Sequence, residues 1–203
     1  MSGEGLKLVL ILGSVRNGRM ADRVAKCVSN SVAKSSTMQL AVVDPLALAP
    51  SCDLNKQPMH FLQNPEQETP LWLKKTNETF QSANGFIVAC PEYNGLMPPA
   101  LLNLMNSVPP ASFRHRPVGI VTYTMGLTGA MRALMILRPY LNELGMLCVP
   151  RYVPIPTVHQ AIDDGGTCTN KLVNENLVKL IRNVEWYARA IDTFKQNGNA
   201  LID

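Results

Sequence analysis

"LVLILGSVRNGRMADRVAKCV", residues 8–28, decides the fold class of this chain. An unbroken apolar run ends at Gly13, and a short polar turn with two arginines follows it. Beyond the turn, apolar residues return every three or four positions, which lines up one face of a helix. The stretch therefore predicts a buried strand over residues 6–12, a turn, and a helix over residues 19–33.

The alternation of strand and helix continues along the chain. Short Val- and Ile-rich runs predict strands at residues 38–44, 85–91, 117–123 and 146–153. Helical patterns lie at residues 70–83, 98–108, 127–144 and 171–194. Because parallel strands need right-handed crossovers that cover a face of the sheet, we expect a doubly wound α/β domain. Residues 45–69, rich in Pro, Gln and Asn, predict one long surface connection.

Bulk composition favours one globular domain over residues 1–203, with flexible ends at residues 1–5 and 196–203. Apolar residues make up 46 % of the chain, enough to bury a continuous core. The net charge of +4 is slight and dispersed, which excludes the basic stripe of a nucleic-acid binder. No apolar run is long enough to cross a bilayer, so no membrane partner is expected. Five cysteines without a C-x-x-C pair predict reduced thiols in the cytoplasm.

Three loops follow the carboxyl ends of predicted strands, where ligands bind in open α/β sheets. The first, "GSVRNGR" at residues 13–19, offers backbone N–H groups, the Ser14 hydroxyl, Arg16 and Arg19 at the start of a helix. These groups suit a phosphate dianion, although the motif is neither G-x-G-x-x-G nor a P-loop. The alternative is that Ser14 only caps the helix while both arginines are solvated.

The second and third loops offer surfaces for a flat ring. "PEYNG" at residues 91–95 presents backbone amides and Tyr93 to a planar heterocycle. Residues 124–126 leave the fourth strand, and Gly129 falls within the predicted start of the next helix. In the alternative interpretations, Tyr93 is an interface residue and Asn94-Gly95 is an ordinary turn. The third loop would then only connect the strand to the helix and bind no ligand.

Together the three loops resemble the NAD(P)H-dependent FMN reductases of the flavodoxin-like fold, a family that includes quinone, azo-dye and chromate reductases. The resemblance is carried by "GSVRNGR", by "PEYNG" followed by P-x-x-L-x-N, and by "VTYTMGLTGAMRALMILRPYLNELG" at residues 121–145. It implies a five-stranded parallel flavodoxin-like sheet with helices on both faces. It also implies bound FMN, with NADPH or NADH as co-substrate.

The resemblance further implies a set of cofactor-binding residues: Ser14, Arg16, Arg19, Met20, Pro91, Glu92, Tyr93, Asn94, Gly95, Thr124, Met125 and Gly126. No catalytic side chain is implied, since hydride transfer takes place at flavin N5. The implied acceptors are quinones, azo dyes, free flavin or metal oxyanions, and the implied assembly is a homodimer or homotetramer.

The chain departs from the family pattern in two places. Leu102 and Asn106 stand where the family usually has Lys and Asp, and Thr124-Met125 replaces the usual Gly-Gly. The second departure bears on the shape of the site over the flavin ring and hence on the substrate. For Glu92 we favour structural or intersubunit hydrogen bonds over a catalytic role.

Two other functions stay open at the level of sequence. A flavodoxin-like electron carrier or flavin-dependent sensor is disfavoured by Arg16 and by the positive net charge. A dehydrogenase-type nucleotide binder would use Asp44, at the end of the second strand, to hold a ribose. We expect no metal site, because His60, His115 and His159 are far from one another and from the cysteines in sequence.

Overall fold

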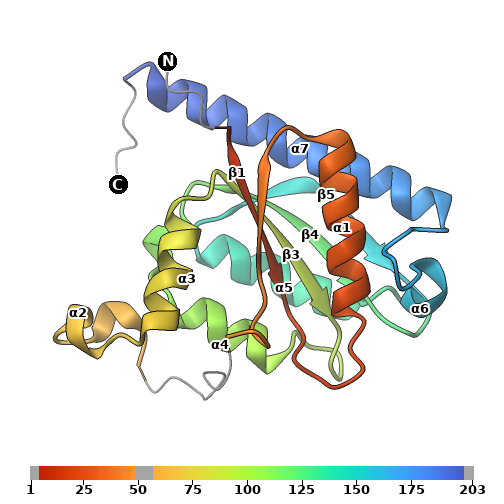
Figure 1. Cartoon of the computed structure of the whole chain (residues 1–203), viewed down its shortest axis with the longest axis horizontal. Coiled ribbons are helices and arrows are strands. Elements are labelled where there is room, and N and C mark those ends of the chain that lie inside the picture. The colour runs from red at the N-terminus through yellow and green to blue at the C-terminus, as the bar shows by residue number, and fades with distance from the viewer. Residues whose placement is uncertain (1–4, 49–56, 199–203) are drawn as a thin grey trace.

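The computed structural model describes residues 5–48 and 57–198. Its five strands are β1 (Lys7–Leu12), β2 (Gln39–Val43), β3 (Gly85–Pro91), β4 (Pro117–Tyr123) and β5 (Leu147–Ile155). They form one all-parallel sheet in the order β2-β1-β3-β4-β5 (Figure 1). This is the flavodoxin-like arrangement that the sequence predicts. The side on which successive strands are added reverses between β1 and β3, and ligands bind at such a switch point in open α/β sheets.

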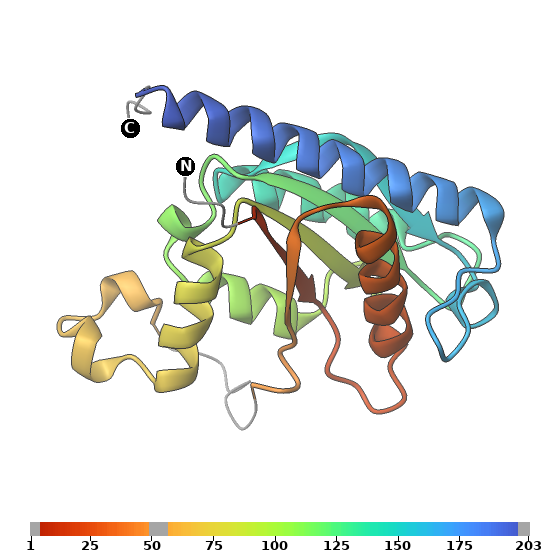
Figure 2. The same cartoon turned by 45° about the horizontal axis from the view of Figure 1, so that its top comes forward.

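Helices cover both faces of the sheet. They are α1 (Ala21–Ser35), α2 (Pro65–Glu68), α3 (Leu71–Gln81), α4 (Pro99–Ser107), α5 (Met131–Glu143), α6 (Val158–Ala161) and α7 (Lys171–Gln196). α1 and α7 pack together on one face, and α3, α4 and α5 lie on the other (Figures 1 and 2). Alternate residues of each strand therefore enter different cores: Leu8 and Leu10 pack under α1 and α7, whereas Val9 and Ile11 face the other layer.

Burial explains the sequence of the central strands. Every residue of β3 and β4 is buried, and β1 is buried from Leu8 onward. A strand covered on both faces has no solvent side, so it reads as a continuous apolar run instead of an alternating one. β2 is an edge strand with three exposed residues, which suits its more mixed composition.

Two helix starts differ from the sequence prediction. α1 begins at Ala21 instead of residue 19, with Met20 at its N-cap position. α5 begins at Met131 instead of residue 127, because Gly129 and Ala130 have φ values of 62° and 64°. These left-handed backbone conformations cannot belong to a right-handed helix, so α5 begins beyond them. Gly129 is thus a loop residue and not part of the helix start.

Smaller differences occur elsewhere. β5 continues to Ile155, two residues past its predicted end, and α6 was not predicted. The predicted connection at residues 45–69 contains a short 3-10 helix, Met59–Phe61, as well as α2, while residues 49–56 lie outside the described residues. α7 continues to Gln196. The expected flexible ends fall largely on residues 1–4 and 199–203, which also lie outside the described part.

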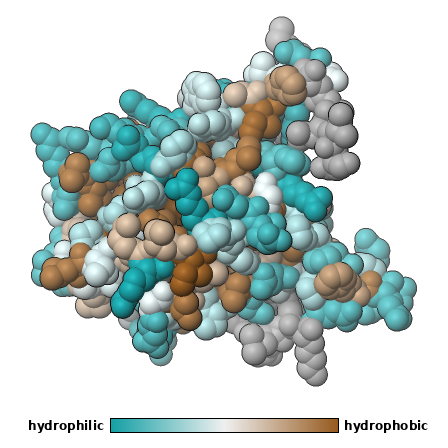
Figure 3. Space-filling view, turned by 180° about the vertical axis from the view of Figure 1, so that it is seen from behind, coloured by the Kyte–Doolittle hydropathy of each residue, from teal (hydrophilic) through white to brown (hydrophobic). Residues whose placement is uncertain are grey.

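Several large apolar side chains are exposed on the surface of the described chain. Met135 of α5 is 70 % exposed and Trp186 of α7 is 64 % exposed. Figure 3 shows the rear of the molecule, where hydrophobic side chains gather at several places among hydrophilic ones. Within residues 5–48 and 57–198, no helix combines the length and apolar character needed to span a membrane.

Candidate functional site

A cavity of about 280 Å³ opens at the carboxyl ends of β1, β3 and β4. Its size is near the lower end of the roughly 300–1,000 Å³ of ordinary ligand pockets. The lining comes from the three loops singled out in the sequence together with α6: Ser14, Arg16, Asn17, Gly18, Arg19, Met20, Pro91, Glu92, Tyr93, Tyr123, Thr124, Met125 and Val158. The parallel register brings these loops together, because it aligns the ends of the three central strands.

Most of the site residues expected from sequence line this cavity. Nine of them do so: Ser14, Arg16, Arg19, Met20, Pro91, Glu92, Tyr93, Thr124 and Met125. Asn94, Gly95 and Gly126 do not. Asn94 and Gly95 have φ values of 53° and 84° and form the tip of a tight turn closed by paired Tyr93 and Leu96 backbone bonds. Both central φ values are positive, as a type I′ turn requires.

Four lining residues were not selected from the sequence. Asn17 and Gly18 lie inside the quoted first loop, so their position was the available signal. Tyr123 is the last residue of a predicted strand and lies within the quoted third motif, so its position was the available signal. Val158 starts the short helix α6, and no sequence pattern pointed to it.

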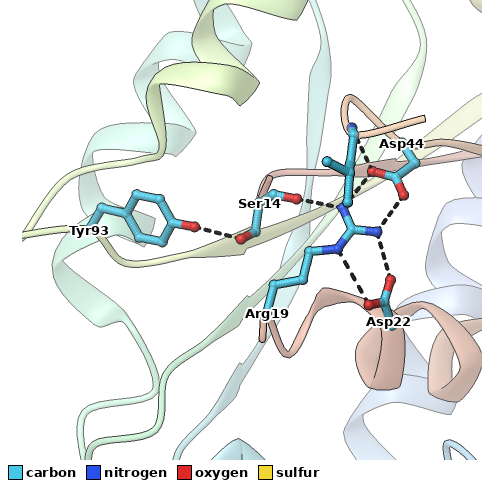
Figure 4. Close-up of polar contacts among 6 residues, drawn as sticks. Ser14, Arg19, Asp22, Asp44 and Tyr93 are labelled. Atoms are coloured by element: carbon cyan, nitrogen blue, oxygen red, sulfur yellow. Dashed lines mark hydrogen bonds and ion pairs between the residues drawn. The ribbon is translucent and has the colours of Figure 1, made fainter. Parts of the chain in front are cut away.

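The Arg19 guanidinium is held by two carboxylates (Figure 4). It forms two hydrogen bonds with Asp44, at 2.6 and 2.5 Å, and a third at 2.6 Å with Asp22 Oδ1. Its Nη1 also donates to the Ser14 carbonyl at 2.6 Å, and its side chain is only 6 % exposed. The hydrogen bonds that Arg19 donates to Asp44 raise the pKa of Arg19 above its usual value. The structure therefore commits this side chain to a structural ion pair, where the sequence suggested a phosphate ligand.

The Asp44 carboxylate accepts hydrogen bonds from Arg19 and from the Leu46 backbone. Burial works against its charge, but the hydrogen bonds from Arg19 and from the Leu46 backbone N–H outweigh burial and lower the pKa of Asp44. Both carboxylate oxygens of Asp44 already accept hydrogen bonds within the chain, which commits the side chain to this ion pair. The structure gives no support to the dehydrogenase-type role that the sequence left open for it.

Arg16 contrasts with Arg19. It is exposed, its guanidinium carbon lies 3.4 Å from the centre of the Tyr93 ring, and it pairs with no carboxylate within the described part of the chain. The Tyr93 hydroxyl in turn shares a 2.5 Å hydrogen bond with Ser14 Oγ (Figure 4). Arg16 therefore supplies an uncompensated positive charge to the cavity, in a cation–π contact that costs little to break.

The start of α1 adds backbone donors beside this charge. Its N-cap position is occupied by Met20, which provides no side-chain capping bond. The alternative in which Ser14 caps the helix is wrong, because Ser14 instead bonds Tyr93. The first N–H groups of the helix therefore have no side-chain cap and point their partial positive charge toward the loop.

Tyr123 presents a buried hydroxyl without a partner. The residue is 2 % exposed, it lines the cavity, and its oxygen forms no hydrogen bond among the described residues. Burial, reinforced by Cys90 and Tyr93, raises the pKa of Tyr123 well above its usual value, so the group stays protonated. A buried unpaired hydroxyl costs about 1–3 kcal/mol. Such a group is expected where a ligand completes the hydrogen bonding.

Glu92 is fixed from outside the cavity. Its side chain is 6 % exposed, and Arg132 of α5 binds Oε1 through both Nε, at 2.8 Å, and Nη2. The predicted structural hydrogen bonds of Glu92 are therefore present. Oε2 is buried and has no partner in the described part of the chain, which leaves one acceptor open. Across residues 5–48 and 57–198, no three His, Cys, Asp or Glu side chains are grouped as a metal site would need.

Comparisons with known proteins identify the family of this chain. The family model for NADPH-dependent FMN reductases matches residues 6–160. This chain belongs to that family. A quinone reductase of Escherichia coli is 29 % identical over 141 residues, which cover 68 % of this chain and 70 % of the relative. An NADPH azoreductase of a Bacillus species is 24 % identical over 108 residues, covering 53 % and 61 %.

Solved structures of low sequence identity show the same fold. FerB, a flavoenzyme NAD(P)H:(acceptor) oxidoreductase from Paracoccus denitrificans, superposes with a TM-score of 0.69 at 14 % identity, covering 91 % of this chain and 98 % of FerB. As an FMN reductase, the chain is an oxidoreductase that uses FMN and NAD(P)H. The open Arg16, the uncapped start of α1 and the unpartnered Tyr123 hydroxyl fit a phosphorylated, hydrogen-bonding cofactor.

The Arg19–Asp44 pair makes stability depend on pH. Because the pKa of Asp44 is lowered in the folded chain, its contribution is present above the unfolded pKa of about 4 and disappears as the pH falls through the folded value. We expect Asp44→Asn to lower the free energy of unfolding at pH 7 by about 1–2 kcal/mol. Urea unfolding at several pH values should show this difference shrinking below about pH 4.

Asp164→Asn is the matched control, since Asp164 also pairs with an arginine, Arg23, but is 88 % exposed. A solvated pair of this kind contributes little, so the change should be clearly smaller. Equal losses for the two variants, or a difference for Asp44→Asn that persists in acid, would contradict this account of the pair.

Proposed function

We propose that this FMN reductase binds FMN in the cavity above β1, β3 and β4 and passes electrons from NADPH to quinones or related flat acceptors. The observation that carries the proposal is the pairing, in one cavity, of the uncompensated Arg16 charge with the buried, unpartnered Tyr123 hydroxyl. The acceptor class rests on the E. coli quinone reductase and the Bacillus azoreductase as relatives. In this proposal the whole chain is one FMN-binding domain.

Each part of the cavity takes a distinct role. Arg16 and the N–H groups at the start of α1 bind the phosphate, while Arg19 acts as a positioning residue by fixing the loop to Asp44. Residues 91–93 and 124–125 lie along the ring. Asn94 and Gly95 shape the turn that presents Tyr93, and Gly126 anchors the third loop by accepting a backbone bond from Thr157.

FMN, when bound, supplies the redox chemistry by accepting hydride from the nicotinamide and delivering electrons to the acceptor. The chain itself binds and orients, so no side chain needs to act as a catalytic acid. Met125, which is 59 % exposed at the cavity, provides a soft, adaptable surface for flat acceptors of different shapes.

The direct test is the visible spectrum of the full-length protein loaded with FMN, recorded under anaerobic conditions before and after NADPH is added. We expect a yellow protein that is bleached by NADPH and recovers its colour, with turnover, when a benzoquinone is added. A protein that takes up FMN but does not oxidise NADPH would favour the electron-carrier alternative. A protein that cannot be loaded with FMN would overturn the proposed site.

Arg16→Met should weaken FMN binding while leaving riboflavin binding within about twofold, because only FMN carries the phosphate. A hydrogen bond to a charged group contributes about 1.5–3 kcal/mol, so the dissociation constant for FMN should rise roughly tenfold or more. Quenching of flavin fluorescence measures both ligands. Arg182→Met, at an exposed position of α7, is the control and should bind both flavins as the unchanged chain does. An equal loss for FMN and riboflavin would remove Arg16 from the phosphate.

Tyr123→Phe should weaken FMN binding by roughly 5- to 30-fold, the loss of about 1–2 kcal/mol for one hydrogen bond. Thermal unfolding of the flavin-free variant should be unchanged or shifted upward, because the deleted hydroxyl has no partner there. Tyr140→Phe is the matched control: its hydroxyl bonds Asn106 at 2.7 Å away from the cavity, so stability should fall and FMN affinity should stay. The same pattern in Tyr123→Phe would show that its hydroxyl is structural.

Assembly and location are further parts of the proposal. A homodimer or homotetramer is supported by large apolar side chains such as Met135 that are exposed in the single chain. The cytoplasm is supported by the free thiols of the four described cysteines, Cys27, Cys90, Cys148 and Cys168.

A further inference from the structure

Two thiols meet in a second cavity that shares no residue with the flavin site. Cys27 of α1 and Cys168, in the segment before α7, both line this space of about 190 Å³. Cys27 is 2 % exposed and belongs to the core, whereas Cys168 is half-buried at its edge. The pair thus consists of an accessible thiol with a buried one behind it.

The backbone holds the two thiols together. A Cβ built on Gly166 would lie 2.8 Å from the Cys27 backbone nitrogen, so the turn at residues 163–168 rests directly on α1. Lys26 Nζ donates to the Asp164 carbonyl at 2.9 Å, and the Thr167 N–H donates to Asp163 Oδ1 at 2.7 Å. The contacts of Lys26 and Gly166 therefore hold the turn against α1, and the Thr167–Asp163 bond closes the turn itself.

The surroundings shift the pKa values of the two thiols in opposite directions. The neighbouring Cys27 thiol lowers the pKa of Cys168; burial opposes this effect, and the backbone N–H groups of Asn170 and Asn174 at the start of α7 add to the lowering. The same interaction, together with burial, raises the pKa of Cys27. Cys90 and Cys148 have raised pKa values because of burial. Among the described cysteines, Cys168 is therefore the one whose pKa is shifted toward the thiolate form that peroxides attack.

We infer that Cys168 and Cys27 form a reversible, peroxide-oxidised dithiol site. The Cys168 thiolate attacks one oxygen of hydrogen peroxide, the O–O bond breaks, and the departing hydroxide takes a proton to form water. The Cys27 sulfur then attacks the resulting sulfenic sulfur, and the S–O bond breaks. The departing hydroxide takes the Cys27 proton as a second water. Two thiols become one disulfide while one peroxide becomes two waters.

The disulfide would connect the two sides of the flavin site through the backbone. α1 follows the loop that carries Arg16, and Cys168 follows a segment that begins with Thr157 and Val158. The N–H groups of these two residues donate to the Gly126 and Thr124 carbonyls of the third loop, at 2.9 and 3.0 Å. A bridge that closes a loop of this length in the unfolded chain also stabilises the oxidised protein.

The test treats the full-length, flavin-free protein with hydrogen peroxide at pH 7 and maps its peptides without reduction by mass spectrometry. We expect a Cys27–Cys168 cross-linked peptide, reversal by dithiothreitol, and a higher unfolding temperature for the oxidised form. Cys168 should react at least about tenfold faster than Cys148. Because no flavin is used, the outcome is independent of whether the proposed FMN site is correct.

Three variants separate the roles of the cysteines. Cys27→Ser should leave Cys168 as a sulfenic acid that dimedone traps, and Cys168→Ser should abolish the fast reaction. Cys148→Ser, the control, should form the bridge at the normal rate. A peroxide reaction of normal speed in Cys168→Ser, a bridge between any other pair, or direct conversion of Cys168 to sulfinic acid in the unchanged chain would overturn the inference.

Discussion

The ion pair between Arg19 and Asp44 is the constraint on which the site depends. It joins the loop after β1 to the end of β2, and the same guanidinium holds the Ser14 carbonyl. With that carbonyl fixed, the Ser14 hydroxyl is set to meet Tyr93, which belongs to the loop after β3. One nearly buried cation thus connects the ends of three neighbouring strands. A glycine-bearing loop without this pair would have no comparable reason to keep one shape.

The same pair decides how charge is distributed. Two carboxylates compensate Arg19, so it contributes shape to the cavity and little net potential. Arg16, three residues earlier, has no such partner in the described part of the chain and rests on an aromatic ring. Because carboxylates already compensate Arg19, and Arg132 binds Glu92, the exposed Arg16 guanidinium beside a helix start favours an anionic ligand. Arg19 therefore has the structural role in this loop, and Arg16 has the binding role.

Helix α1 links the flavin site to the thiol pair. Its N-cap residue, Met20, lines the cavity above the sheet, and about two turns further along Cys27 shares a cavity with the segment that precedes α7. That segment also reaches the third loop of the flavin site through backbone hydrogen bonds. Both sites therefore share one rigid helix and one connecting segment, although none of their side chains is common to both.

The sequence by itself determined the sheet, the order of helices and strands, and the three loops that form the site. Buried parallel strands must be continuously apolar, and helices repeat their apolar residues every three or four positions. Both patterns can therefore be recognised from residues that are close together in the sequence. The tertiary structure alone decided what Arg19 and Tyr123 do. Asp44 is 25 residues from Arg19, and the missing partner of the Tyr123 hydroxyl depends on every element packed around it. Pairing and burial of this kind are set by contacts distant in sequence, which no local pattern records.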